Sequence, residues 1–355
     1  MTKKEKTVLM MAAGTGGHVF PALSLAKVFK EKGYRVCWLG TKTGIEVRLV
    51  GQERYPLYAL PVKGLRGKRL LKLIMAPFEI LRSFLMSAWI ILKVKPEVVV
   101  GMGGYVSGPG GLAAKLLGKR LVLHEQNAIP GLTNRLLSKI SSATLCAFPG
   151  TFSASAKAHC IGNPVREEIS TLSHPFARYN DRSGPLRILV FGGSLGARVF
   201  NQMLPKCVSG LGFDVEVWHQ SGKAGLSDAQ AGYQKHFPSA RVDAFIDDMA
   251  EAYAWADLVV CRAGALTVSE LMAAGVASIL IPYPYAVDDH QTANAKALVS
   301  VGAAILMQET EFSIESLSAQ LTLLSQREVL REMAVCAYNC RQINATQQAV
   351  FLCLS

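Results

Sequence analysis

The sequence is short of acidic side chains, and its first half contains no aspartate. Residues 1–163 hold 24 Lys and Arg against seven Glu, a net charge of +17, whereas residues 164–355 hold 14 basic and 19 acidic side chains. An asymmetry of this kind is typical of a protein that meets a negatively charged partner, either nucleic acid or an anionic membrane surface. A solvated basic face without a partner is the alternative explanation.

The sequence also lacks the residue pairs of common metal sites. Its eight cysteines are scattered, with no Cys-x-x-Cys pair, which argues against a structural zinc site and against a disulfide framework. Most of them, such as Cys37 and Cys261, lie in apolar runs and are predicted to be small buried side chains in a reducing compartment. No Asp-x-Asp pair occurs, so a divalent metal bridging a diphosphate is not indicated. We expect neither a metal nor a cofactor.

No apolar run is long enough to cross a bilayer. The run between Arg82 and Lys93 has ten uncharged residues, well below the roughly 20 that a membrane span needs. Residues 8–13 imitate a signal peptide but lead at once into glycines, so we predict a buried strand there. With 355 residues, 50% hydrophobic and 18% charged, the chain is expected to fold as two domains and not to be disordered.

Short apolar runs alternate with helical patterns, which predicts α/β units with parallel strands. Strands are expected at 8–13, 35–39, 98–100, 120–124, 187–191, 215–219, 258–261 and 277–281. A strand that leads into a glycine-rich turn and a helix occurs in both halves, at 8–30 and from 187 onward, so each half is predicted to be a doubly wound, Rossmann-like domain. Two such domains would face a shared central cleft. We expect domains at 1–163 and 164–339, with the loop at 173–185 as a second candidate boundary.

Three glycine-rich loops, at 14–17, 101–109 and 192–198, point to phosphate chemistry. A turn that opens a helix presents backbone N–H groups and the positive end of the helix dipole, which together bind diphosphate. One such loop would be weak evidence, because tight turns need glycine anyway. Neither the first nor the third loop is Gly-x-Gly-x-x-Gly, and the run 38–41 ends without an acid for a ribose, so a hydride-transfer enzyme is disfavoured.

His18 follows the first glycine loop, and Pro21 suits the first turn of the helix predicted to begin there. A helix N-terminus disfavours the imidazolium form, so a neutral His18 could accept a proton from an attacking hydroxyl. The alternative is that His18 orients the loop or hydrogen-bonds a substrate, since a carboxylate is the commoner base in sugar chemistry.

Two polar runs in the second half could hold a sugar nucleotide. In the run 261–270, Thr267 and Glu270 have the spacing of a capping box, and the same turn could cradle phosphate while Glu270 accepts hydrogen bonds from ribose hydroxyls. The run 288–294 could supply amide and imidazole groups to sugar hydroxyls, or it could be an ordinary helix start.

Residues 63–95 combine basic side chains with an apolar, aromatic stripe at helical spacing. This combination is typical of a segment that lies on anionic lipid, although part of the stripe could equally be packed in the core. The residues that we expect to associate with a membrane are Lys68, Arg69, Lys72, Met75, Phe78, Leu85 and Trp89.

Six segments in order along the chain resemble the MurG family, the undecaprenyldiphospho-muramoylpentapeptide N-acetylglucosaminyltransferases. They are 14–21, 101–109, 124–127, 162–166, 192–198 and 261–270. The resemblance implies the two-domain GT-B fold, a C-terminal helix at 340–355 that returns to the first domain, and inverting transfer of N-acetylglucosamine from UDP-N-acetylglucosamine to the muramyl 4-hydroxyl of lipid I. It also implies a peripheral protein on the cytoplasmic face of the bacterial cell membrane, with no nucleic-acid partner.

The resemblance carries donor and acceptor contacts onto individual residues of this chain. Leu195, His290 and Ala13 depart from the family's pattern, and Leu195 removes one contact to phosphate or sugar. A UDP-N-acetylglucosamine 2-epimerase of the same fold and a non-catalytic nucleotide-sugar sensor are the alternatives. The implied substrate-binding residues are Thr15, Gly16, Gly17, Asn127, Arg166, Ser194, Ile246, Ala265, Leu266, Thr267, Val268, Ser269, Glu270 and Gln291.

Overall fold

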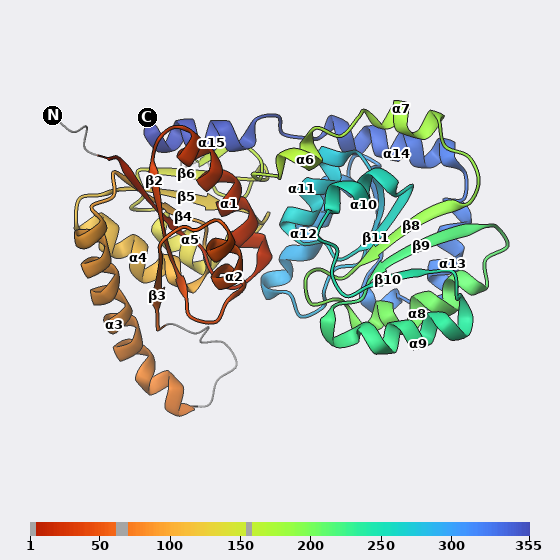
Figure 1. Ribbon diagram of the computed structural model, residues 1–355, viewed down its shortest axis with the longest axis horizontal. Helices are drawn as coiled ribbons and strands as arrows, with labels where there is room; N and C mark the ends of the chain where they lie inside the picture. The colour runs from red at the N-terminus through yellow and green to blue at the C-terminus, as the bar shows by residue number, and fades with distance from the viewer. Residues whose placement is uncertain (1–4, 62–69, 154–157) are drawn as a thin grey trace. The chain divides into compact units, whose positions relative to one another are not determined.

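The structure, a computed structural model, describes residues 5–61, 70–153 and 158–355. The chain divides into two compact units: unit 1 is Met1–Arg166 with Gln342–Ser355, and unit 2 is Glu167–Arg341. Each unit is a parallel sheet covered by helices (Figure 1). The predicted α/β class with two doubly wound units is therefore confirmed, while the shared cleft stays a prediction.

Unit 1 contains a seven-stranded sheet in the order β3-β2-β1-β4-β5-β6-β7, and every neighbouring pair is parallel. Its strands are β1 (Thr7–Met11), β2 (Arg35–Thr41), β3 (Leu57–Leu60), β4 (Val98–Gly101), β5 (Arg120–Glu125), β6 (Ala143–Cys146) and β7 (Ala158–Cys160). Its helices are α1 (Gly16–Glu31), α2 (Ile45–Gln52), α3 (Leu70–Val94), α4 (Gly104–Leu116), α5 (Leu132–Leu137) and α15 (Ala345–Leu354).

The central strands of unit 1 are buried on both faces, because helices cover each side of the sheet. Val8 and Met10 of β1 pack in one core with α1 and α15, whereas Leu9 and Met11 pack in the other with α3 and α4. Burial on both faces explains why the sequence of β1 is a continuous apolar run and does not alternate, as predicted from residues 8–13.

Helix α15, at the C-terminal end of the chain, packs beside α1 in unit 1 (Figure 1). Arg120 at the start of β5 donates from Nε to the Cys353 carbonyl at 2.9 Å and from Nη2 to the Leu352 carbonyl at 3.1 Å. The last carbonyls of a helix have no partner within the helix, so this guanidinium satisfies them and fixes where α15 ends.

Unit 2 contains a six-stranded parallel sheet in the order β10-β9-β8-β11-β12-β13. Its strands are β8 (Leu186–Phe191), β9 (Val215–Gln220), β10 (Arg241–Asp243), β11 (Leu258–Cys261), β12 (Ala277–Leu280) and β13 (Ala304–Leu306). Its helices are α6 (Glu167–Ser170), α7 (Pro175–Asn180), α8 (Arg198–Ser209), α9 (Leu226–His236), α10 (Met249–Trp255), α11 (Ala265–Ala274), α12 (His290–Val299), α13 (Ile314–Leu323) and α14 (Arg327–Asn339).

All eight predicted strands are present, and the structure adds five that the sequence patterns missed. Of these five, β3, β7, β10 and β13 form the four outer edges of the two sheets, and β6 lies next to an edge. Each has three or four residues, as β4, β11 and β12 have four, but unlike those three strands none of the five is buried throughout. Among the helices of the described residues, none is both long and apolar enough to cross a membrane.

Candidate functional site

In unit 1, three of the segments that resemble the family lie at the ends of adjacent strands, β1, β4 and β5. Because β1, β4 and β5 are parallel neighbours, the loops that follow them lie at one edge of the sheet, where doubly wound folds bind ligands. The first carries Thr15 and leads into Gly16 and Gly17, the second leads into α4, and the third carries Asn127. A hydrogen bond from His18 Nδ1 to Gln126 Oε1, at 2.8 Å, joins the first loop to the third.

His18 is the third residue of α1, and its ring lies against the second glycine loop. A Cβ atom added to Gly103 would lie 3.4 Å from His18 Cε1, and one added to Gly104 would lie 3.8 Å from Cδ2. The ring edge that carries Nε2 therefore faces two residues without side chains. The prediction that Pro21 lies in the first turn was wrong: α1 already begins at Gly16, because the Thr15 carbonyl accepts from His18 N and Val19 N, so Pro21 is the sixth residue.

A buried carboxylate that the sequence reasoning missed supports the first loop. Glu46, in the first turn of α2, is fully buried. Its Oε2 accepts from Gly14 N at 3.2 Å, and its Oε1 accepts from Thr41 N at 2.9 Å and Thr41 Oγ1 at 2.6 Å. The acid that the end of β2 lacks is thus supplied five residues later, and it binds the protein's own loop.

Glu125 organises the loop that presents Asn127. Its Oε1 accepts from Asn127 N at 3.0 Å and Asn127 Nδ2 at 3.1 Å. Its Oε2 accepts from Gly131 N at 3.1 Å and Asn134 Nδ2 at 2.9 Å, at the start of α5. A buried carboxylate with four donors holds the loop in one conformation. Glu125 lies in the segment 124–127 that carries the family resemblance, but it was not predicted as a site residue.

Arg166 lies beside α1 in unit 1, with its guanidinium 5.3 Å from the centre of the Phe20 ring. The segment before it is fixed to β5 and the loop after β5: the Gly162 carbonyl is 2.9 Å from His124 Nε2, and Asn163 Nδ2 donates to the Gln126 carbonyl at 3.1 Å. Arg166 is therefore held near the same set of loops as His18.

In unit 2, Gln220 connects two of the predicted donor positions. This side chain at the end of β9 is 3% exposed and was not predicted. Its Nε2 donates to the Gly193 carbonyl at 2.9 Å, in the loop that exposes Ser194, and its Oε1 accepts from Ile246 N at 2.8 Å. One amide thus fixes the spacing between the glycine loop and the segment at Ile246.

The same glycine loop touches a second backbone segment so closely that side chains are excluded. A Cβ atom on Gly196 would lie 1.9 Å from the Ser221 carbonyl oxygen, and one on Gly222 would lie 2.1 Å from the Leu195 carbonyl oxygen. Helix α8 begins at Arg198 without a side-chain cap. The loop therefore presents an uncapped helix start, as a diphosphate site requires.

The predicted residues 265–270 form the first turns of α11, which follows β11. The capping-box interpretation of Thr267 was wrong: the N-cap is Gly264, so Thr267 lies inside the helix and no side chain caps it. Glu270 is 4% exposed and its Oε2 accepts from Tyr253 Oη at 3.1 Å. Val268 is fully buried, backbone and side chain alike. The remaining predicted positions in this turn are Ala265, Leu266 and Ser269.

Gln291 is the second residue of α12, directly after a short 3₁₀ turn at Val287–Asp289. Its Oε1 accepts from Tyr283 N at 2.9 Å. This bond orients the amide so that its NH2 group points away from Tyr283. Within residues 5–61, 70–153 and 158–355, no three His, Cys, Asp or Glu side chains lie close enough together to hold a metal ion.

Comparisons with known proteins match both units of the chain. Residues 8–146 match the glycosyltransferase family 28 N-terminal domain and residues 187–349 match the family 28 C-terminal domain. A UDP-N-acetylglucosamine--N-acetylmuramyl-(pentapeptide) pyrophosphoryl-undecaprenol N-acetylglucosamine transferase of Shewanella baltica strain OS185 is 49% identical over 360 residues, covering 100% of this chain and 99% of the relative. The enzyme of the same name from Marinobacter nauticus is 49% identical over 349 residues, covering 98% and 96%.

Solved structures agree with these sequence matches. The crystal structure of Acinetobacter baumannii MurG superimposes with a TM-score of 0.85 at 43% identity, covering 98% of this chain and 99% of that one. The chain belongs to the MurG family of glycosyltransferase family 28. The family resemblance and the GT-B fold predicted from the sequence are both confirmed. A putative UDP-N-acetylglucosamine 2-epimerase from Listeria monocytogenes has a TM-score of 0.67 at 14% identity, a likeness of fold alone.

In this member of the MurG family, α3 exposes a row of large apolar side chains. Phe78 is 72% exposed, Leu85 57% and Trp89 60%, and the spacing of three and four residues continues through Leu81 and Leu92. The opposite side of α3 carries buried residues, among them Ile90, Ile91, Ser83 and Ser87. The stripe at Phe78, Leu85 and Trp89 is therefore on the surface, and a different side of α3 packs in the core. Lys68 and Arg69 lie outside the described residues, as do the side chains of Lys72 and Met75.

Two neighbouring helices, α4 and α5, also expose large apolar side chains, which the sequence patterns did not predict. Helix α4 packs on α3 and on α5. It exposes Leu112 and Leu116, and α5 exposes Leu132 and Leu136. Exposed basic side chains lie on the same three helices or next to them: Arg82, Lys93, Lys95, Lys115, Arg135 and Lys139. We call the apolar side chains of α3, α4 and α5 together the apolar surface.

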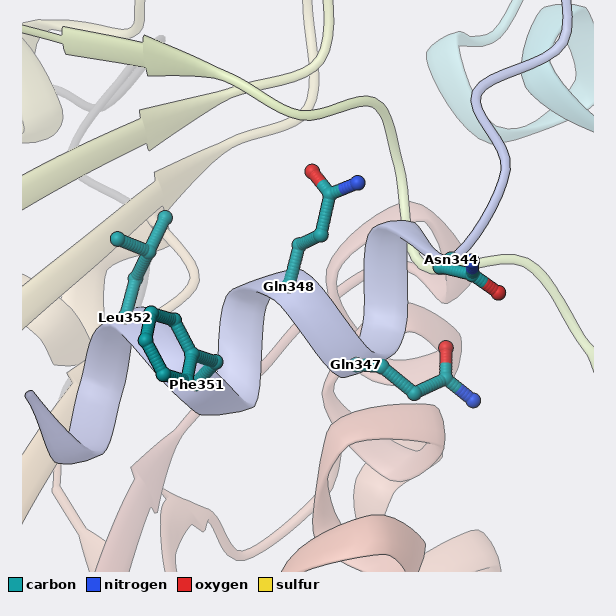
Figure 2. Close-up of a pocket in the computed structure, with 5 residues that line it drawn as sticks. All are labelled: Asn344, Gln347, Gln348, Phe351 and Leu352. Atoms are coloured by element: carbon teal, nitrogen blue, oxygen red, sulfur yellow. The ribbon is translucent and has the colours of Figure 1, made fainter.

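A shallow hollow also lies on α15, lined by Asn344, Gln347, Gln348, Phe351 and Leu352 (Figure 2). None of these side chains is a titratable group, and none belongs to the predicted site residues. Four of them belong to α15, and the fifth, Asn344, is the residue directly before it in unit 1. The hollow therefore contributes nothing to the site described above.

Proposed function

We propose that this chain transfers N-acetylglucosamine from UDP-N-acetylglucosamine to the 4-hydroxyl of the muramyl sugar of lipid I, with inversion at the anomeric carbon. The observation that carries the proposal is the 49% identity to transferases of that name over the full length of the chain. Both units needed for such a reaction are therefore present, each with a glycine loop that opens a helix.

Unit 2 is proposed to bind the donor. The uncapped starts of α8 and α11 would face the diphosphate, with Ser194 at the first and 265–269 at the second. Glu270, held by Tyr253, would accept from the ribose hydroxyls, and Gln291 would donate from its amide to the N-acetylglucosamine. The segment at Ile246 would meet the uracil. Helix N-termini stabilise the negative charge that develops on UDP as it leaves.

Unit 1 is proposed to bind the acceptor and to supply the base. The muramyl 4-hydroxyl oxygen forms the new bond to the anomeric carbon while the bond from that carbon to the UDP oxygen breaks. The hydroxyl proton passes to Nε2 of His18, beside Gly103 and Gly104. Thr15, Gly16, Gly17, Asn127 and Arg166 would contact the acceptor or the donor from this side.

We further propose that the apolar surface, with the basic side chains around it, holds unit 1 on an anionic membrane that carries the lipid-linked acceptor. Apolar side chains enter the headgroup boundary while Lys and Arg meet lipid phosphates. The protein would then be peripheral, on the cytoplasmic face, where UDP-N-acetylglucosamine is available.

Product analysis tests the proposed reaction. Purified protein is incubated with labelled UDP-N-acetylglucosamine, with and without a short-chain analogue of lipid I in detergent. We expect label in a lipid-linked disaccharide and one UDP released for each disaccharide formed. Without the acceptor, we expect no labelled disaccharide. Conversion to UDP-N-acetylmannosamine would instead identify the epimerase alternative, and binding without product would identify a sensor.

A further inference from the structure

Three side chains of unit 1 form a continuous hydrogen-bonded chain from the first glycine loop to the segment at 162. His18 Nδ1 lies 2.8 Å from Gln126 Oε1, Gln126 Nε2 lies 3.0 Å from His124 Nδ1, and His124 Nε2 lies 2.9 Å from the Gly162 carbonyl oxygen. Gln126 Nε2 also lies 3.0 Å from the His124 carbonyl oxygen. Gln126 and His124 are both fully buried.

The two carbonyl groups determine the direction of every bond in this chain, because a carbonyl oxygen can only accept. The Gly162 carbonyl requires a proton on His124 Nε2. The His124 carbonyl requires that the NH2 group of Gln126, and not its oxygen, lies on that side. The Gln126 oxygen is left facing His18, where it can only accept, so Nδ1 of His18 must carry a proton.

Burial keeps His124 in the neutral form that this pattern needs. Loss of solvent lowers the pKa of His124 to about 4, against smaller raising effects of the Gly162 carbonyl and of Glu125. A neutral imidazole has one N–H and one acceptor nitrogen. With its proton on Nε2, His124 offers Nδ1 as acceptor to the Gln126 amide, which completes the chain.

We propose that Gln126 is a positioning residue that fixes His18 as the tautomer with the proton on Nδ1, leaving Nε2 as the basic nitrogen. His124 and the Gly162 carbonyl act through Gln126 as its anchor. The inference rests on the proposed role of His18 as the base and adds which atom accepts the proton. A hydrogen bond to the far nitrogen of a catalytic imidazole plays the same part in the Ser-His-Asp triad.

The position of the ring gives this tautomer a chemical use. The edge with Nε2 faces Gly103 and Gly104, at the start of α4, whereas Nδ1 faces the buried Gln126. In the other tautomer the acceptor nitrogen would point into the protein, and a proton would block the nitrogen near the glycine loop. Gln126 thus holds His18 in the tautomer whose Nε2 can accept a proton.

Nitrogen-15 NMR of the imidazole groups tests the tautomer directly in the full-length protein without substrates. The His18 signals are assigned by their loss in His18→Ala. We expect wild type to show a protonated Nδ1 and an unprotonated Nε2 at pH values where the ring is neutral. A protonated Nε2 in wild type would overturn the proposal.

Three glutamine variants separate positioning from packing. Gln126→Met has similar volume but no N–H donor and only a weakly accepting sulfur. Gln126→Glu keeps an oxygen that accepts from His18 Nδ1 and, as the neutral acid that burial favours, has an O–H that can donate toward His124. Gln347→Met makes the first change at an exposed position of α15. We expect Gln126→Met to mix the His18 tautomers and lower kcat by about 10- to 100-fold, with KM within about twofold. Gln126→Glu should restore the Nδ1–H tautomer and most of kcat, and Gln347→Met should match wild type.

Two measurements, the His18 tautomer and kcat, separate the positioning role of Gln126 from the proposed role of His18 as the base. Gln126→Met with wild-type tautomer and wild-type kcat would overturn the positioning role. Equal losses of kcat in the Met and Glu variants, without a tautomer change in either, would also overturn it, because they indicate packing alone. A changed tautomer with unchanged kcat would support the positioning of His18 and remove its role as base.

Discussion

At the scale of single residues, the proposed chemistry depends on the imidazole of His18. It is the titratable side chain that α1 holds beside both glycine loops of unit 1, with Nδ1 bonded to Gln126 and Nε2 toward Gly103 and Gly104. A general base contributes about 10²–10⁴-fold to a rate, so its loss is measurable above background transfer.

We expect His18→Ala to lower kcat by about 100-fold or more, because no other group at that position can take the proton. Initial rates with labelled UDP-N-acetylglucosamine and a lipid I analogue measure it. His236→Ala, at the end of α9 in unit 2, is the matched control and should keep wild-type rates. Turnover of His18→Ala within a few-fold of wild type would leave His18 as an orienting residue and would require another base.

Glu46 gives a prediction about stability, because its carboxylate accepts from two backbone N–H groups and a hydroxyl while fully buried. Glu46→Gln keeps the shape but turns one acceptor into a donor that faces another donor. We expect unfolding free energy to fall by about 1–3 kcal/mol, measured by denaturant titration. Glu53→Gln, exposed at the end of α2, should change it little. Equal stability of the two variants would contradict this account of the loop.

Residues proposed to contact a ligand were easier to predict from the sequence than residues that hold the ligand-binding loops in place. Thr15, His18 and Asn127 follow apolar strands directly, so their place at the sheet edge could be predicted from local pattern. Glu46, Gln126 and Gln220 act through hydrogen bonds to backbone or side-chain groups that are 5 to 108 positions away along the chain. Such bonds exist only in the folded chain, and no local pattern indicates them.

At the scale of helices and strands, α3 is unusual because one side is packed in unit 1 and the other exposes Phe78, Leu85 and Trp89. The surface of a soluble monomeric protein rarely carries so many large apolar side chains in one row. Lys93 lies 4.9 Å from the centre of the Trp89 ring, so a cation accompanies the aromatic side chain at the end of the helix.

We expect Leu85→Ser with Trp89→Ser to weaken binding to vesicles of anionic lipid by about tenfold or more, since each side chain would bury apolar area worth about 1.5–3 kcal/mol. Sedimentation with vesicles at low and high salt measures it, and thermal melting checks the fold. Leu323→Ser with Val301→Ser, exposed in unit 2, is the control. Unchanged binding of the α3 variant would remove this helix from the proposed membrane contact.

Elements were predictable where burial and turn chemistry coincide, and were missed where either is weak. The strands before the glycine loops are largely apolar and buried, and they lead into turns with positive φ, such as Gly14 and Gly193. The edge strands are short and partly exposed, so nothing in their composition separates them from loops. The starts of α1 at Gly16 and α11 at Ala265 lack capping side chains, so Pro21 was mistaken for a first-turn residue and Thr267 for an N-cap.

At the scale of the whole molecule, each unit encloses one fully buried histidine behind its sheet edge. His124 belongs to β5 of unit 1, and His219 belongs to β9 of unit 2, where its Nδ1 lies 3.0 Å from Tyr233 Oη. Burial lowers the pKa of His124 to about 4 and that of His219 to about 3. Both rings are therefore neutral in the folded protein at pH values where they are protonated in an unfolded chain.

This difference predicts that both units lose stability in mild acid. Between the unfolded pKa of about 6.5 and the folded values, the unfolded state binds more protons, so unfolding free energy falls as pH falls. At pH 5 each histidine accounts for about 2 kcal/mol. Calorimetry from pH 7.5 to 5 should show melting temperatures that drop most steeply below about pH 6.5.

His219→Phe separates this effect from the titration of the carboxylates. The variant loses a bond to Tyr233 and is expected to be less stable at pH 7.5, but unit 2 should then lose less stability on acidification than in wild type, by about 2 kcal/mol at pH 5. The unit 1 transition should keep its original pH dependence, because His124 is unchanged. If both transitions of the variant follow the wild-type slope, the buried histidines do not set the acid limit of this fold.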